Sequence, residues 1–195
     1  MKLITFQHKN VLKEIERGGI YHCMKMSECC ENNITLYLEI KDMLKAPWFP
    51  VFAWARILNK DLEVSLEQMN RADEMTPHDD TDLILELEVP ENENYLFQEF
   101  YDYVGCMYSK FDEVHLPEER IIDGIHKIST RDMPDNNAEV QCVLPYIKKE
   151  WVKSVYEFKK EDVEEQINPI IADMVGVPKD TMVEHTRITE LIKVY

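Results

Sequence analysis

Several short stretches of the chain alternate hydrophobic and polar residues with a period of two, which is typical of β-strands. The clearest is LILELEV at 83–89, where the leucines and Val89 share one face and Glu86 and Glu88 share the other. This alternation predicts a strand with one buried and one solvated face. Further strands are predicted at 3–7, 20–23, 51–57, 139–145 and 151–158.

Other stretches place apolar residues three or four positions apart, as amphipathic helices do. The best example lies at 8–19, where Val11, Leu12 and Ile15 are followed by Gly18-Gly19, a pair that commonly ends a helix. Further helices are predicted at 24–45, 63–75, 94–104, 118–128 and 161–175, and the final stretch 181–195 is also expected to be helical.

Strands and helices alternate irregularly in this prediction, and the later strands follow one another closely. That order favours an α+β fold with a mixed, largely antiparallel sheet flanked by helices. We expect one α+β domain over 1–159 and a C-terminal helical appendage over 160–195.

Composition places the chain among globular proteins, with 195 residues, 45% of them hydrophobic and 10% aromatic. The formal net charge of −16 disfavours direct binding to nucleic acid, because phosphate backbones repel an acidic surface.

No stretch approaches the ~20 apolar residues of a membrane span, and the opening MKLITFQHKN lacks the apolar run of a signal peptide. Five cysteines, an odd number, are ordinary in a reducing compartment. We therefore expect a cytoplasmic protein without a membrane partner.

Common catalytic and metal-binding patterns are absent. The chain has five glycines, and none has the spacing of a phosphate-binding loop. His22-Cys23 and Cys29-Cys30 offer zinc ligands, but their spacing matches no standard zinc site. The acidic run at 79–82 lacks the turn glycine and the distal glutamate of a calcium loop. We therefore predict no metal site.

Acidic residues are concentrated between residues 61 and 102, where fourteen aspartates and glutamates face a single basic residue, Arg71. A second acidic stretch spans 161–173. Such a surface serves solubility in most proteins, but it also steers association with a basic protein.

Four segments carry a resemblance to a known family. They are KLITFQHKNVLKEIERGGIYHC, FPVFAWARI, LILELEVP and VQCVLPYIKKEWVKSVYEF. Together they look like the uncharacterised bacterial "domain of unknown function 3841" family, over residues 1–159. The family's opening Thr-x-Gln strand is matched by Thr5 and Gln7, and its Pro-Ile-Trp-Ala-Trp segment in part by Pro50, Ala53 and Trp54.

A weaker resemblance is to ADP-ribosyltransferase-like domains, which share the strand, helix, Gly-Gly, strand opening and a late strand containing Gln or Glu. Such domains bind NAD in a cleft between two small sheets. A late-strand carboxylate or amide there holds the ribose while nicotinamide departs from an oxocarbenium-like sugar. The late-strand residue in this chain is Gln141, whose polar side chain interrupts an apolar strand.

The same resemblance implies further NAD contacts. Thr5 or Gln7 would hold the nicotinamide-side ribose, and Tyr37 or Trp54 would stack on the nicotinamide ring. A nearby cation would meet the pyrophosphate, for which the sequence offers Arg56, His8 and Lys9.

Two function classes are therefore open. In the first, the chain is a nucleotide- or NAD-binding protein related to ADP-ribosyltransferases, with Gln141 as its catalytic residue. In the second, it is a non-enzymatic acidic interaction protein, such as a phage or mobile-element inhibitor that mimics nucleic acid and binds a basic host protein through residues 61–102.

Overall fold

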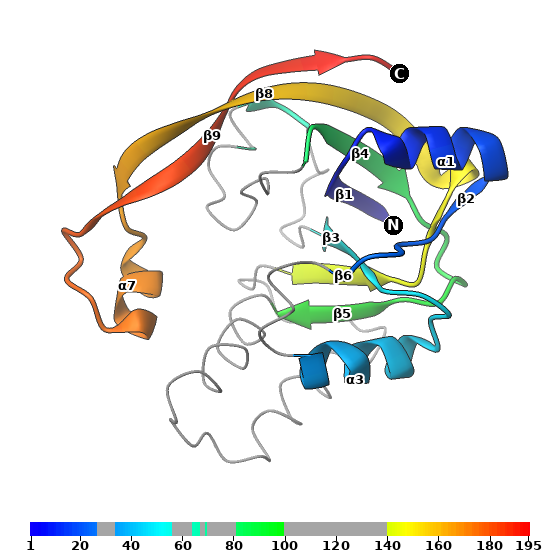
Figure 1. Ribbon diagram of the computed structural model, residues 1–195, viewed down its shortest axis with the longest axis horizontal. Helices are drawn as coiled ribbons and strands as arrows, with labels where there is room; N and C mark the ends of the chain where they lie inside the picture. The colour runs from blue at the N-terminus through cyan, green and yellow to red at the C-terminus, as the bar shows by residue number, and fades with distance from the viewer. Residues whose placement is uncertain (27–33, 56–63, 67–68, 70–80, 100–139) are drawn as a thin grey trace.

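The computed structural model describes residues 1–26, 34–55, 64–66, 69, 81–99 and 140–195 (Figure 1). The elements of the first half are β1 (Lys2–Gln7), α1 (Asn10–Gly18), β2 (Ile20–Tyr21), α3 (Ile34–Leu44), β3 (Val51–Ala55), β4 (Leu83–Glu88) and β5 (Leu96–Glu99). Those of the second half are β6 (Val140–Leu144), β7 (Ile147–Lys148), a 3₁₀ turn at Lys149–Trp151, β8 (Val152–Gln166), α7 (Pro169–Val175) and β9 (Met182–Lys193). The helices predicted at 63–75 and 118–128 lie largely or wholly outside the described residues.

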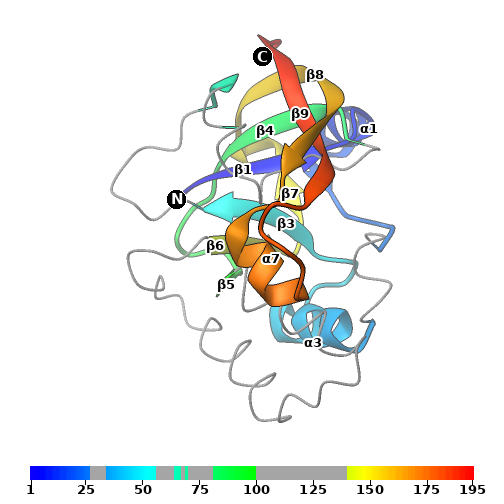
Figure 2. The ribbon, with the colours of Figure 1, turned by 90° about the vertical axis from the view of Figure 1, so that its left-hand side faces the viewer.

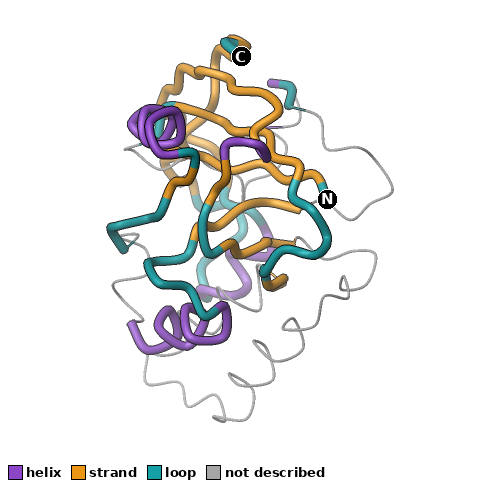
Figure 3. Tube along the Cα trace, turned by 90° about the vertical axis from the view of Figure 1, so that its right-hand side faces the viewer, coloured by secondary structure: helices purple, strands orange, loops and turns teal. Residues whose placement is uncertain are grey.

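The main sheet has seven strands in the order β5-β6-β3-β1-β4-β8-β9 (Figure 2). Every neighbouring pair in it is antiparallel. Strand β2 pairs instead with β7 in a separate two-stranded sheet. The α+β class and the largely antiparallel sheet are therefore confirmed. The helices lie at the periphery of the strands (Figure 3).

One face of the main sheet is covered by α1. Val11 and Ile15 of this helix pack into a cluster with Leu3, Leu85 and Cys142. The helix ends where the sequence predicts, because Gly19 adopts the left-handed conformation (φ 76°) and its N–H donates to the Ile15 carbonyl. The turn at Gly19 directs the chain into β2, whose partner β7 immediately precedes the 3₁₀ turn.

The opposite face of the sheet is covered as well. Helix α3 packs Ile40 and Leu44 against Val143, while Ile4 and Ile84 belong to a third buried cluster. Ile84 is fully buried even though it lies between the leucines of LILELE. The strand and its leucine face are confirmed, but the expectation of a half-solvated strand is wrong at this position. Ile84 is covered on this face by the cluster that contains Ile4, Trp54 and Phe158.

The predicted helix at 94–104 is wrong at its start, because residues 96–99 form strand β5. Leu96 lies opposite Val143 and Phe97 opposite Cys142, so alternate side chains reach opposite faces of the sheet. Phe97 and Tyr95 are both buried, and their rings meet edge to face at 5.3 Å. Two buried faces suit a strand, whereas a helix would bury one stripe.

The expected C-terminal helical appendage is also wrong for most of its length. Strand β8 runs from Val152 to Gln166 without a break at the expected boundary, and β9 pairs with it over residues 182–193. Only α7 is helical; Asn168 caps its start, Pro169 follows, and Gly176 ends it. The two segments form strands and not helices because each strand satisfies the backbone N–H and C=O groups of the other.

We name residues 160–184 the acidic arm. It comprises the second half of β8, helix α7 and the start of β9. Strand β4 pairs with β8 only over Val152–Glu157, and the two-stranded ribbon then continues beyond it to α7 (Figure 1). Phe158 and Ile188 anchor the base of the ribbon in the cluster that contains Ile4.

Replacing Leu85, which is fully buried on the central strand β4, tests this core. We expect Leu85→Ala to lower the free energy of unfolding by about 2–5 kcal/mol, because it leaves a cavity against both neighbouring strands. Urea unfolding measures the change. The control is Glu88→Ala at a largely exposed position of the same strand, for which we expect a change within about 0.5 kcal/mol. Equal effects of the two substitutions would contradict the assignment of this core.

Candidate functional site

Gln141, the residue on which the nucleotide-binding interpretation depends, lies in the middle of β6. It is opposite Trp54 on β3 and Gln98 on β5. Its side chain is 8% exposed, so it is one of the few buried polar residues in the described part of the chain. The glutamine is therefore enclosed between neighbouring strands.

Thr5 and Gln7 lie on β1 and contact each other. The Thr5 hydroxyl donates to the Phe52 carbonyl oxygen at 2.7 Å and accepts from Gln7 Nε2 at 2.8 Å. Thr5 is fully buried, and its hydrogen bond crosses from β1 to β3. A buried hydroxyl with both a donor and an acceptor partner is stable without a ligand.

The strand register separates these residues from Gln141. Thr5 is opposite Leu85, whose side chain belongs to the cluster under α1. Trp54 is opposite both Ile4 and Gln141, and Ile4 and Trp54 belong to the cluster on the other face. Because directly opposed residues share a face of the sheet, Thr5 and Gln7 lie on one face while Trp54 and Gln141 lie on the other. The structure does not bring the four into one cleft.

The remaining NAD-contact candidate in the described residues, Tyr37, is 1% exposed on α3. Its ring lies 5.7 Å from that of Phe49 and 6.0 Å from that of Phe52, and its hydroxyl donates to the Pro50 carbonyl. These contacts fix α3 against the start of β3. Arg56 lies outside the described residues.

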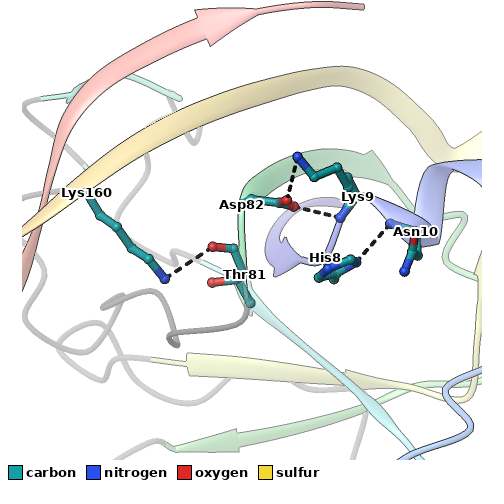
Figure 4. Close-up of polar contacts among 6 residues, drawn as sticks. All are labelled: His8, Lys9, Asn10, Thr81, Asp82 and Lys160. Atoms are coloured by element: carbon teal, nitrogen blue, oxygen red, sulfur yellow. Dashed lines mark hydrogen bonds and ion pairs between the residues drawn. The ribbon is translucent and has the colours of Figure 1, made fainter.

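The cationic candidates His8 and Lys9 are engaged with the start of α1 (Figure 4). Asp82 accepts from the Lys9 N–H at 2.6 Å and forms an ion pair with the Lys9 ammonium at 3.2 Å. His8 Nδ1 accepts from the Asn10 N–H at 3.1 Å. The positive end of the helix is thus satisfied by groups of the protein, with a carboxylate where a phosphate would otherwise bind.

A second polar cluster surrounds Glu93, between β4 and β5. Its carboxylate accepts from Lys148 Nζ at 2.6 Å and from the Tyr146 hydroxyl at 3.1 Å. Lys148 Nζ also lies over the rings of Tyr146 and Trp151, at 5.4 and 5.3 Å from their centroids. The ring of His22 meets Tyr146 edge to face, at 5.9 Å. The cluster joins the two-stranded sheet to the loop before β5.

The pKa values of two groups in this cluster, Tyr146 and Lys148, are both raised. Burial raises the pKa of Tyr146, and the hydrogen bond and negative charge of Glu93 add to the increase. The hydrogen bond to Glu93 likewise raises the pKa of Lys148, against the opposing effect of burial. Tyr146 therefore stays a hydrogen-bond donor and Lys148 a cation at neutral pH, so neither group is prepared to act as a base.

Neither a reactive thiol at Cys142 nor a metal-binding cluster is found in the described part of the chain. Burial raises the pKa of the Cys142 thiol far above its usual range, so this cysteine is unreactive. The described residues contain no group of three or more His, Cys, Asp or Glu side chains placed to hold a metal ion. Across the same residues, every helix is too short or too polar to span a membrane.

The acidic arm carries a strong excess of negative charge. Residues 160–184 contain seven acidic and two basic residues. Both basic residues are engaged within the chain, because Lys160 donates to the Thr81 carbonyl and Lys179 pairs with Asp173 at 2.8 Å. Glu164 lies directly opposite Glu184 across the ribbon, an arrangement of like charges that destabilises a strand pair.

Three carboxylates of the arm are exposed. Glu161, Glu164 and Glu184 make no ion pair with any residue that the structure describes. The sequence indicates the charge but not its arrangement, because the pairing of Glu164 with Glu184 follows from the register of two strands expected to be helices.

Comparison with protein-family models, with curated proteins and with solved structures gives no significant match to this chain.

The pKa of Tyr146 gives a test of the Glu93 cluster. Because folding raises this pKa, the tyrosine stabilises the fold below its ordinary pKa of 10.0, and that contribution is lost as the pH rises through the raised value. The difference in unfolding free energy between wild type and Tyr146→Phe should therefore shrink as the pH rises above 10.0, the ordinary pKa of the tyrosine. Urea unfolding at each pH measures it. Glu93→Gln should lower the Tyr146 pKa, whereas Glu91→Gln, at an exposed neighbouring position, should not. If the difference in unfolding free energy instead grows with pH, the folded protein does not raise the pKa of Tyr146.

The two-face arrangement leads us to expect that NAD does not bind at Thr5, Gln7, Trp54 and Gln141. Thermal unfolding with NAD, ADP-ribose or nicotinamide should then match unfolding without ligand. A ligand present at 100 times its Kd would add about 2.7 kcal/mol of apparent stability. A ligand-induced shift that disappears in Gln141→Ala, and persists in the control Gln166→Ala at an exposed glutamine, would contradict this expectation.

Proposed function

We propose that this chain is an acidic interaction protein that binds a basic protein partner, with the acidic arm as its principal contact surface. The observation that carries the proposal is the pairing of Glu164 with Glu184 on an exposed ribbon where no basic residue of the described chain compensates them. A ribbon that holds like charges face to face loses stability, and a cationic surface placed against it offsets that loss.

The shape of the arm supports the same proposal. It continues beyond β4 as a two-stranded ribbon, so a partner can approach it without displacing the core of the sheet (Figure 1). Ile170 and Val175 of α7 are 53% and 47% exposed, and Met182, at the start of β9, is 56% exposed. These exposed apolar side chains offer a centre for an interface, which typically has an apolar core and a polar rim.

The charge of the whole chain acts in the same direction. A net charge of −16 gives a long-range field that attracts a cationic protein and repels nucleic acid. The segment 61–102 adds to this field; of its fourteen acidic residues, those before Asp82 lie outside the described residues. Steering of this kind accelerates association and weakens as salt rises.

Neutralising the arm without changing its shape tests the proposal. The variant E161Q/D162N/E164Q removes three charges, and the matched control E14Q/E16Q/E150Q removes three exposed charges elsewhere. Each chain is used to capture proteins from a cell extract at low and at high salt, and the captured proteins are identified by mass spectrometry. We expect wild type and the control to retain a basic protein at low salt only, and the arm variant to lose it.

The strength of the effect is then measured with the purified partner. Exposed ion pairs contribute about 0.2–1 kcal/mol each, so loss of three should raise the Kd by roughly tenfold. The salt dependence of the Kd should also be shallower for the arm variant than for the control. If the arm variant retains every captured protein with unchanged affinity, the arm is not the contact surface and the proposal fails.

A further inference from the structure

The two sides of the ribbon in the acidic arm carry different side chains. From Lys160 to Gln166, β8 pairs with β9 without a register shift, so its even-numbered residues lie on one side and its odd-numbered residues on the other. Each β9 residue shares the side of the β8 residue directly opposite it. We name these sides the even face and the odd face. At the base of the even face, the Lys160 ammonium donates to the Thr81 carbonyl.

The odd face already contains a cation. Arg187 Nη1 lies 3.2 Å from Glu165 Oε1, and Arg187 is directly opposite Glu161. Val163 and Val183 lie on the same face, and both are half-buried. A basic partner that approaches the odd face therefore meets a positive charge of this chain.

The even face carries acidic residues that are exposed to solvent. Asp162, Glu164 and Glu184 all lie on this face and are exposed. The Asp162 carboxylate accepts a hydrogen bond from the Thr186 hydroxyl at 2.9 Å, which holds it on the face. Glu164 and Glu184 make no hydrogen bond or ion pair with any residue that the structure describes. The even face is therefore the side on which a cationic partner is complementary in charge.

The spacing of these carboxylates suits a guanidinium group. Directly opposed residues of an antiparallel pair have Cβ atoms about 5 Å apart, so one planar cation can reach both Glu164 and Glu184. A guanidinium has five N–H donors in a fixed fork, whereas an ammonium acts as a point charge. Asp162 lies two residues from Glu164, about 7 Å along the strand, which is the spacing of alternate residues in an extended partner.

An exposed methionine lies beside this pair of glutamates. Met182 is opposite Gln166, two residues beyond Glu164 on the same face, and it is 56% exposed. An arginine buries its methylene stem on apolar surface and keeps its charged group in a polar environment. The even face offers both surfaces to such a side chain.

We propose that the even face is the contact surface of the acidic arm, and that its occupant is an extended segment of the basic partner with arginines at alternate positions. One arginine donates to Glu164 and Glu184 together, with its stem against Met182, and the next donates to Asp162. Charge complementarity selects this occupant, because one guanidinium offsets the repulsion between two opposed carboxylates. The inference rests on the proposed function, since it assigns one side of the arm and one chemical class to the partner.

Two variants that remove the same charge from opposite faces test the choice of face. E164Q/E184Q neutralises the even face, and the matched control E161Q/E165Q neutralises the odd face of the same ribbon. The probe is a synthetic peptide in which arginine alternates with threonine. Its Kd is measured by isothermal titration calorimetry at physiological salt, where distant charges are screened. We expect E161Q/E165Q to match wild type within about twofold, and E164Q/E184Q to bind roughly fivefold more weakly.

A second peptide, with lysine in place of each arginine, separates recognition of the guanidinium from attraction by charge. Both peptides carry the same charge, so a surface that attracts charge alone binds them equally. We expect wild type to bind the arginine peptide roughly fourfold more tightly than the lysine peptide. This preference should disappear in E164Q/E184Q.

Folding is checked by urea unfolding. E164Q/E184Q removes two opposed like charges, so it should be at least as stable as wild type. Equal weakening by the two variants overturns the inference. So does equal binding of the two peptides, or a wild-type chain that binds neither. None of these results overturns the proposed function, which fails if E161Q/D162N/E164Q retains every captured protein.

Discussion

The fold depends on the continuous backbone pairing of β8, which belongs to the sheet and to the acidic arm at once. Its first part, Val152–Glu157, pairs with β4, and Tyr156–Gln166 pairs with β9, so the two pairings overlap at Tyr156 and Glu157. Because backbone groups buried between strands must be paired, the direction of the arm is fixed by the register in the sheet. The placement of Glu164 opposite Glu184 follows from this register.

Local patterns in the sequence explain which of the predicted elements are confirmed. Strands and the first helix are local features, and their patterns are readable in the sequence: the LILELE alternation and the Gly18-Gly19 stop both correspond to observed elements. Which side chains share a face depends on the register between distant strands, which a single sequence does not contain. Thr5 and Gln141 each lie on a strand where expected, yet on opposite faces of the sheet.

Helix propensity explains the two misassigned segments. The glutamate-rich stretch from 161 to 166 is composed of residues that readily form helices, and an isolated peptide of this composition has no competing partner. In the folded chain, β9 supplies such a partner, and pairing outweighs propensity. The aromatic segment that contains Tyr95 and Phe97 is also a strand and not a helix, because pairing with β6 allows its side chains to be buried on both faces. In both cases a contact with a distant segment decides the structure.

Electrostatics sets the range over which the acidic arm acts. A net charge of −16 gives a field that attracts a cationic protein at long range. At physiological salt the Debye length is about 8 Å, so attraction between distant charges is largely screened, while charges in direct contact are screened less. Salt should therefore slow the encounter with a basic protein more than it weakens contacts already formed at Glu164 and Glu184, which the strand register holds opposite each other.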